Sequence, residues 1–189
     1  MSSLVAAGCG IATDDSPRDI EPRAATPITD AATRGAASGA ESIFLVAPGQ
    51  LDRLDAVARD TGDDPRAVVE AVLAGPSADE VDDGYRSMLP ASLVVNQVEV
   101  RDGGVLAIDL SADIRDVVAD DLPLALAQLV YSIDPLPDIS SVLVTVDGEE
   151  GRWPAGNGEP VSGPLTVYDY PGLLESTPPA SPTTPTTGG

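Results

Sequence analysis

The 189-residue sequence has no histidine, a single cysteine and very few aromatic side chains. Histidine is the commonest general base and metal ligand in proteins, so its absence removes the usual candidate for either role. One cysteine excludes an internal disulfide and any multi-cysteine metal site. No apolar run approaches the roughly 18 residues that a membrane-spanning helix needs. We therefore expect no metal site and no cofactor.

Basic residues are also scarce, because 10 lysines and arginines stand against 31 aspartates and glutamates, giving a formal net charge of −21. Such a surface repels the phosphates of nucleic acids, so we expect no nucleic-acid partner. Aromatic residues make up 3% of the chain. The core of the protein must therefore be aliphatic.

A short apolar run followed by Ala7, Gly8 and Cys9 begins the chain. It resembles the lipobox of bacterial lipoproteins, in which the cysteine carries acyl chains that each add about 0.8 kcal/mol of membrane affinity per buried methylene. The run is shorter than the roughly 7–15 residues of a signal-peptide core, and no basic residue precedes it. We therefore expect residues 1–9 to be the remnant of a lipoprotein signal peptide whose upstream part is missing. The alternative is a cytosolic protein with a buried or frayed cysteine near its end.

Composition divides the rest of the chain into three parts. Residues 10–40 are rich in Ala, Thr, Asp, Pro and Gly without a hydrophobic period, which predicts a disordered tether. Residues 173–189 end in a run of Pro, Thr, Ser and Gly, which predicts a disordered tail. One folded domain is predicted between them, over residues 41–172.

The most specific pattern lies in residues 92–148. Apolar and polar residues alternate on both sides of a Gly-rich turn at residues 102–104, which predicts a β-hairpin. A helix is predicted from Leu122 to Pro135, with Asp121 as its cap, because apolar residues recur there at helical spacing. Alternating valines at 142, 144 and 146 predict a further strand.

Weaker signals flank this unit. A strand is predicted at residues 43–46, and residues 51–59 are a polar connector that can continue as a strand. Asp64 and Pro65 predict the start of a helix, and residues 77–80 have the spacing of a capping box for a short second helix. Residues 161 and 165–170 predict an additional edge strand. The fold class is α+β: a small, mainly antiparallel sheet of four to five strands with two main helices packed on one face.

Five segments, in this order and spacing, resemble a known bacterial domain. They are 71–76 (AVLAGP), 89–90 (LP), 98–100 with 105–111 (VEV and VLAIDLS), 124–131 (LALAQLVY) and 144–149 (VTVDGE). On these segments the chain from Ile43 to about Tyr170 resembles the GerMN (sporulation and spore germination) domain. The resemblance implies an extracytoplasmic, often actinobacterial, lipoprotein with a non-catalytic module of envelope and sporulation assemblies. It implies no catalytic residues.

Asp109, Ser111 and Asp113 form the most conspicuous polar cluster. Their oxygens suit calcium, but the Gly turn and terminal bidentate carboxylate of calcium loops are missing. We therefore expect Asp109 and Ser111 to cap the end of the strand and the following turn. Gln128 interrupts an apolar helix and is expected to hydrogen-bond to a neighbouring strand from a buried position.

Trp153, Tyr168 and Tyr170 lie in the irregular C-terminal region. Aromatic residues are enriched at the centres of protein interfaces, so these three are the candidate interaction surface. The alternative is that they cover the open edge of the sheet. Aspartate pairs at 63–64, 82–83 and 120–121 are expected near helix ends, where a carboxylate close to an N-terminus contributes about 0.3–1 kcal/mol.

The sequence thus predicts an extracytoplasmic lipoprotein, anchored to the cell membrane by a lipid on Cys9, whose domain is not an enzyme. Its expected partners are membrane lipid and an envelope protein or peptidoglycan, in sporulation, germination or envelope signalling. Two alternatives remain: a cell-wall hydrolase that uses acidic residues, and an accessory sensor module of a membrane kinase. No nucleophile elbow and no phosphate-binding Gly-rich loop is present.

Overall fold

The computed structural model describes residues 42–174. The predicted signal-peptide remnant with Cys9, the tether at 10–40 and the tail from 175 onward lie outside the described residues.

A two-stranded antiparallel sheet begins the domain. Strand β1 (Ser42–Val46) pairs with β2 (Leu54–Ala58), so the stretch predicted as a connector does contain a strand. Four of the five β1 residues are buried, whereas in β2 only Leu54 is buried and the other four positions are half-buried or exposed. Only β1 of this hairpin is therefore buried in the core along most of its length.

The main sheet has the order β3-β4-β5-β6. Strands β3 (Val95–Arg101) and β4 (Val105–Leu110) form the predicted hairpin, and β5 (Ser141–Val146) turns back into the short β6 (Glu149–Glu150). Strands β4 and β5 are parallel because a helix connects them, whereas the other two pairs are antiparallel. The prediction of a mainly antiparallel sheet in an α+β fold is confirmed.

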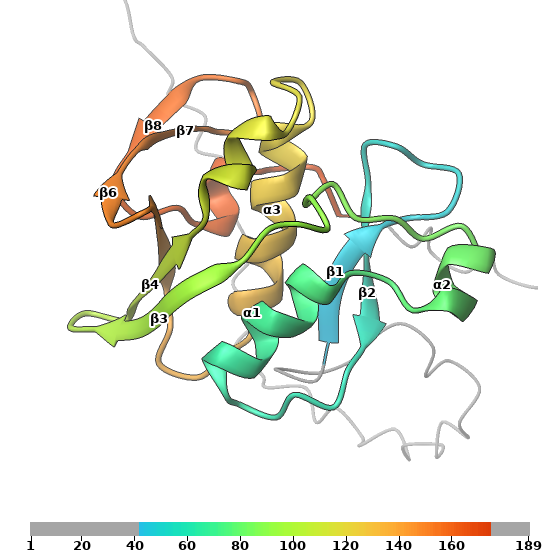
Figure 1. Cartoon of the computed structure of the whole chain (residues 1–189), viewed down its shortest axis with the longest axis horizontal. Helices are drawn as coiled ribbons and strands as arrows, with labels where there is room; N and C mark the ends of the chain where they lie inside the picture. Colours follow the sequence, from blue (N-terminus) through green and yellow to red (C-terminus); the bar gives the residue numbers. More distant parts are fainter. Residues whose placement is uncertain (1–41, 175–189) are drawn as a thin grey trace, which may run out of the picture. The chain divides into compact units, whose positions relative to one another are not determined.

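Helix α3 (Leu122–Ile133) makes that crossover and is the centre of the domain (Figure 1). Its residues from Leu124 to Ile133 are all buried, as expected of a helix that is apolar on every side. It lies between the main sheet and the β1–β2 hairpin, beside helix α1 (Pro65–Ala74). The core-facing side chains of β4 (Leu106, Ile108 and Leu110) are fully buried beneath this layer.

The start of α1 is as predicted. The Asp64 side chain accepts a hydrogen bond of 3.0 Å from the Arg66 amide, and Pro65 occupies the first helical position. Asp121 stands at the N-cap of α3 without a side-chain cap bond, and Asp83 is the C-cap of α2, where the helix dipole disfavours a carboxylate. The dipole argument therefore fits Asp64 and Asp121, which stand at helix N-termini, and does not fit Asp83.

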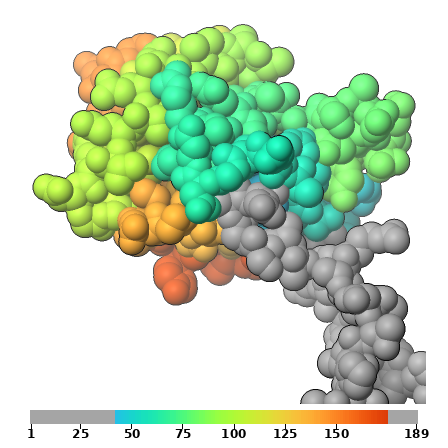
Figure 2. Space-filling view, turned by 90° about the horizontal axis from the view of Figure 1, so that it is seen from below, coloured from blue at the N-terminus to red at the C-terminus, as the bar shows by residue number. Residues whose placement is uncertain are grey.

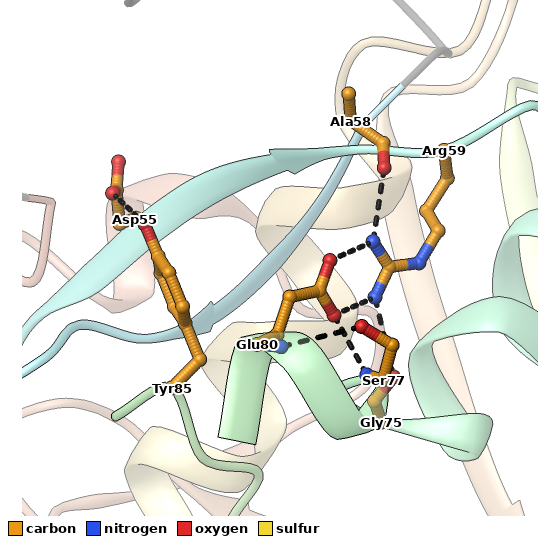
Figure 3. A network of polar contacts seen from close by, with 7 residues as sticks. All are labelled: Asp55, Ala58, Arg59, Gly75, Ser77, Glu80 and Tyr85. Carbon is orange, nitrogen blue, oxygen red and sulfur yellow. Dashed lines mark hydrogen bonds and ion pairs between the residues drawn. The ribbon is translucent and has the colours of Figure 1, made fainter. Parts of the chain in front are cut away.

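Helix α2 (Ala78–Asp82) is fixed by a capping box, also as predicted. The Ser77 amide donates to Glu80 Oε2 at 2.7 Å, and the Glu80 amide donates to Ser77 Oγ at 3.4 Å. The same Glu80 carboxylate accepts a hydrogen bond of 2.7 Å from each of the two terminal nitrogens of Arg59 (Figure 3). This bidentate pair ties α2 to the end of β2.

The C-terminal region differs from the prediction. Strands β7 (Arg152–Pro154) and β8 (Pro160–Ser162) form a small hairpin, and a single 3-10 turn, η2 (Val167–Asp169), stands where an edge strand was expected. Thr166 and Asp169 form a capping box around that turn, so local hydrogen bonds replace the ladder. Beyond the predicted domain end at 172, the Leu54 amide donates to the carbonyl of Leu173 at 2.7 Å.

Candidate interaction surface

The outer edge of β5 is completed by three different partners. Val142 exchanges two backbone hydrogen bonds of 2.7 and 2.8 Å with Leu165, and β6 pairs with the other end of β5. Between them, the carbonyl of Val144 accepts a hydrogen bond of 2.9 Å from the indole Nε1 of Trp153. Trp153 therefore fills a gap in the ladder, and its ring is only 6% exposed.

Tyr170 is fully buried. Its hydroxyl donates to the carbonyl of Pro154 at 3.0 Å, and its own carbonyl accepts a 2.7 Å hydrogen bond from Tyr131. Burial raises the pKa of the Tyr170 phenol above its usual value. Trp153 and Tyr170 were predicted to belong to an interaction surface, and that expectation is corrected: both rings pack in the core, where their polar atoms have backbone partners.

Tyr168, the third aromatic residue of the predicted surface, is 88% exposed. It stands in η2 between Val167, which packs against the core, and the buried Tyr170. The red end of the described chain, to which η2 belongs, stands out at the lower edge of the domain in Figure 2. The fold thus fixes the backbone on both sides of this tyrosine and leaves its ring in solvent.

A hollow of about 270 Å³ lies beside Tyr168. Its other walls come from the β7–β8 hairpin and from the residues around η2: Ala155, Asn157, Glu159, Val161, Asp169 and Pro171. The two walls are joined by a backbone hydrogen bond of 2.8 Å from Gly156 to Asp169. A Cβ atom at Gly156 would come within 3.3 Å of the Tyr170 backbone, so this close approach favours glycine.

Sequence reasoning missed the residues that surround Tyr168. The signal that could have found them is Asn157 and Gly158, a pair typical of a tight turn between two strands. That turn would have predicted the β7–β8 hairpin, although not its contact with η2.

A second hollow, also of about 270 Å³, lies on the open face of the main sheet. Its lining is mostly polar: Gln97, Glu99, Arg101, Ala107, Asp109, Thr145, Gly148 and Glu150. Asp109 Oδ1 accepts hydrogen bonds of 2.7 Å from Thr145 Oγ1 and from the Gly148 amide, and Oδ2 accepts one of 3.1 Å from Asn96. These bonds, led by that from Thr145, lower the pKa of Asp109. Asp109 therefore has a structural role, but it closes the β5–β6 turn and not, as expected, the turn that follows its own strand.

Ser111 and Asp113 continue the same pattern. Ser111 Oγ accepts the Val94 amide at 3.1 Å and donates to Asp113 Oδ2 at 2.6 Å, and this second bond is the main cause of a lowered pKa of Asp113. Within residues 42–174 no group of three or more acidic or sulfur side chains is arranged to hold a metal ion.

Gln128 is fully buried and bonded as predicted. Its Oε1 accepts the Met88 amide at 2.7 Å, and its Nε2 donates to the Phe44 carbonyl of β1 at 3.2 Å. One side chain of α3 thus holds both β1 and the loop before β3.

Among the residues that the structure describes, the three carboxyl groups with a displaced pKa all shift downward. The guanidinium of Arg59 lowers the pKa of Glu80 to about 2, and hydrogen bonds lower those of Asp109 and Asp113. Each of these groups is an ionised acceptor held in a cap or turn. No helix within the described part of the chain is long and apolar enough to cross a membrane.

Comparison with solved structures identifies the fold. The first GerMN domain of the sporulation protein GerM from Bacillus subtilis superposes with a TM-score of 0.54 and 20% identity, over 68% of this chain and 97% of that one. The tandem GerMN domains of the same protein give a TM-score of 0.53 and 19% identity, over 68% of this chain and 46% of theirs. The chain thus matches one whole domain and about half of the tandem pair.

A comparison with curated proteins found no matching relative. The family model Germane, described as sporulation and spore germination, matches residues 42–152, which include β1 through β6 and all three α-helices. The chain therefore belongs to the Germane family of sporulation and spore germination domains.

Proposed function

We propose that this protein is an extracytoplasmic lipoprotein that presents its Germane domain as a non-catalytic contact module in a sporulation, germination or envelope-signalling assembly. The family match supports the process. The observation that carries the contact role is the 88% exposure of Tyr168 on a backbone fixed at both sides.

Burial of the Tyr168 ring by a partner would contribute a substantial part of the binding free energy. Burying an aromatic side chain against a partner contributes about 1.5–3 kcal/mol. Because the flanking Val167 and Tyr170 already pack in the domain, little backbone order has to be gained when the partner binds. Such residues commonly dominate the affinity of an interface.

The displaced carboxyl pKa values favour binding over acid–base hydrolysis. A glycoside hydrolase needs one carboxylic acid whose pKa is raised, so that it holds its proton until the leaving group takes it. Glu80, Asp109 and Asp113 are shifted in the opposite direction, and their oxygens are engaged by neighbouring side chains and amides. These groups are stabilising acceptors rather than proton donors.

The proposed anchor is the acylated Cys9. The net charge of −21 gives the protein no attraction to anionic headgroups, and acyl chains on Cys9 would supply the membrane affinity that charge does not. Cell fractionation and mass spectrometry of the protein from its own host test this, with Cys9→Ser as the control. Acylated Cys9 in the membrane fraction is expected, and a free thiol on a soluble protein would contradict the anchor.

The contact role is tested by photocrosslinking in living cells. A photoreactive phenylalanine analogue replaces Tyr168 in the full chain, and a matched variant carries it at Glu149, which is exposed at the β5–β6 turn. One discrete crosslinked envelope protein is expected from position 168 and not from position 149. Equal, diffuse labelling from both positions would contradict a specific contact at Tyr168.

A further inference from the structure

We infer that the hollow beside Tyr168 receives a cationic side chain, arginine or lysine, of a partner protein. The inference rests on the proposed contact function and specifies the chemistry of its partner.

The charged residues that line the hollow are all acidic. Glu159 and Asp169 line it, and its lining contains no basic residue. The nearby Arg152 is not part of the lining, and its Nη2 donates to the carbonyl of Pro160 at 3.3 Å. A cation that enters the hollow therefore lies beside two acidic residues and beside no basic lining residue.

Hydrogen bonds hold both carboxylates in place, and each carboxylate keeps one oxygen that can accept a further hydrogen bond. Asn157 Nδ2 donates to Glu159 Oε2 at 2.8 Å, and the Thr166 hydroxyl donates to Asp169 Oδ2 at 2.9 Å. Within residues 42–174 the second oxygen of each carboxylate, Glu159 Oε1 and Asp169 Oδ1, takes no hydrogen bond from the protein. A guanidinium or ammonium group supplies donors for such oxygens.

The ring of Tyr168 adds the third element of recognition. A cation above the face of an exposed tyrosine is attracted by the negative face of the ring, and a guanidinium can also stack on it. Tyr168, Glu159 and Asp169 all line the same hollow, so one side chain that enters it comes near all three residues.

A single long side chain fits the size of the hollow. The hollow of about 270 Å³ lies below the roughly 300–1,000 Å³ of pockets that enclose drug-sized ligands. It suits one long side chain that projects from a larger partner. Tyrosine and arginine are also the residue types most enriched at interface centres, which fits this pairing.

The first test is a titration of the full-length chain followed by ¹H–¹⁵N NMR. The probes are the peptide acetyl-Gly-Arg-Gly-amide and its citrulline counterpart, which has nearly the same shape and no charge. The arginine peptide is expected to shift amide signals at residues 155–161 and 166–171, and the citrulline peptide is expected to bind at least about threefold more weakly.

Variants locate the site. The substitutions Tyr168→Ala and Glu159→Gln are each expected to lower the affinity of the protein for the arginine peptide about three- to fivefold. Tyr168→Phe keeps the ring and Glu149→Gln removes one charge elsewhere, so both are expected to leave its affinity within about twofold. Because Tyr168 is 88% exposed, its substitution leaves the fold intact, which the unchanged dispersion of the spectrum verifies.

Three results would overturn the inference. If the citrulline peptide binds with the same affinity as the arginine peptide, the site does not recognise the positive charge. If Glu149→Gln and Glu159→Gln lower the affinity for the arginine peptide equally, the peptide is attracted to the acidic surface in general. Preferential binding of N,N′-diacetylchitobiose in the hollow would identify a glycan site instead. If crosslinking at position 168 succeeds while the arginine peptide fails, the proposed function stands and this inference alone falls.

Discussion

The indole nitrogen of Trp153 donates to the carbonyl of Val144, nine residues earlier in the chain, at 2.9 Å. Because both groups are buried, the bond is shielded from water and has no solvent replacement. A side chain here takes the place of a strand.

Trp153→Phe keeps an aromatic ring in the core and removes this donor. We expect a loss of about 1–3 kcal/mol in the free energy of unfolding, because the Val144 carbonyl is left buried and unpaired. Urea titration followed by circular dichroism measures it. Tyr168→Phe is the matched control and should change stability by less than about 0.5 kcal/mol.

Gln128→Met preserves the length of the side chain but leaves two backbone groups, Met88 N–H and Phe44 C=O, without their present partner. A destabilisation of about 2–4 kcal/mol is expected from their desolvation. The same substitution at the exposed Gln97 serves as the control. If both variants unfold at the same denaturant concentration, the Gln128 bridge does not stabilise the domain.

Leu126→Ala and Leu129→Ala remove side chains that are fully buried in α3. Each should cost about 2–5 kcal/mol, because lost burial and a residual cavity act together. Leu51→Ala, at a position 60% exposed, should be nearly neutral. A loss below about 1 kcal/mol at either buried position would be incompatible with close packing around α3.

Stability should depend on pH through Glu80, whose pKa falls from 4.5 to about 2 on folding because of Arg59. A folded pKa below the unfolded one stabilises the fold above the unfolded pKa, and this contribution is lost as pH falls through the folded value. The difference in unfolding free energy between the native protein and Glu80→Gln should therefore be largest near neutral pH. It should decrease as the pH falls from about 4.5 to about 2. The pair is partly exposed, so the gap should be modest and should shrink at high salt. A gap that is the same at pH 7 and pH 2.5 would exclude this carboxylate as its cause.

Local signals predicted the elements that local chemistry decides. Asp64 with Pro65, and Ser77 with Glu80, specify helix starts through hydrogen bonds between residues two or three apart, and the structure contains both. The β3–β4 hairpin follows for the same reason, since its turn connects adjacent strands.

Long-range pairings decided the positions that sequence reasoning missed. Nothing near Trp153 indicates that β5 lacks a partner at Val144, so the ring could not be assigned to the core. Residues 165–170 alternate like a strand, but Leu165 pairs with Val142 only once before the Thr166 capping box bends the chain into η2. The exposure of Tyr168 and the hollow beside it are consequences of that bend.

The family match ends at residue 152, one position before the tryptophan that completes β5. The match therefore ends inside the folding unit of this protein, which continues to residues 165 and 170 in the core. A fragment cut at 152 would leave the β5 edge bare from Val142 to Val144 and would remove Leu165 and Tyr170 from the core. Such a bare edge is prone to pair with other chains. The C-terminal twenty or so described residues thus act as a seal on the open edge of the main sheet.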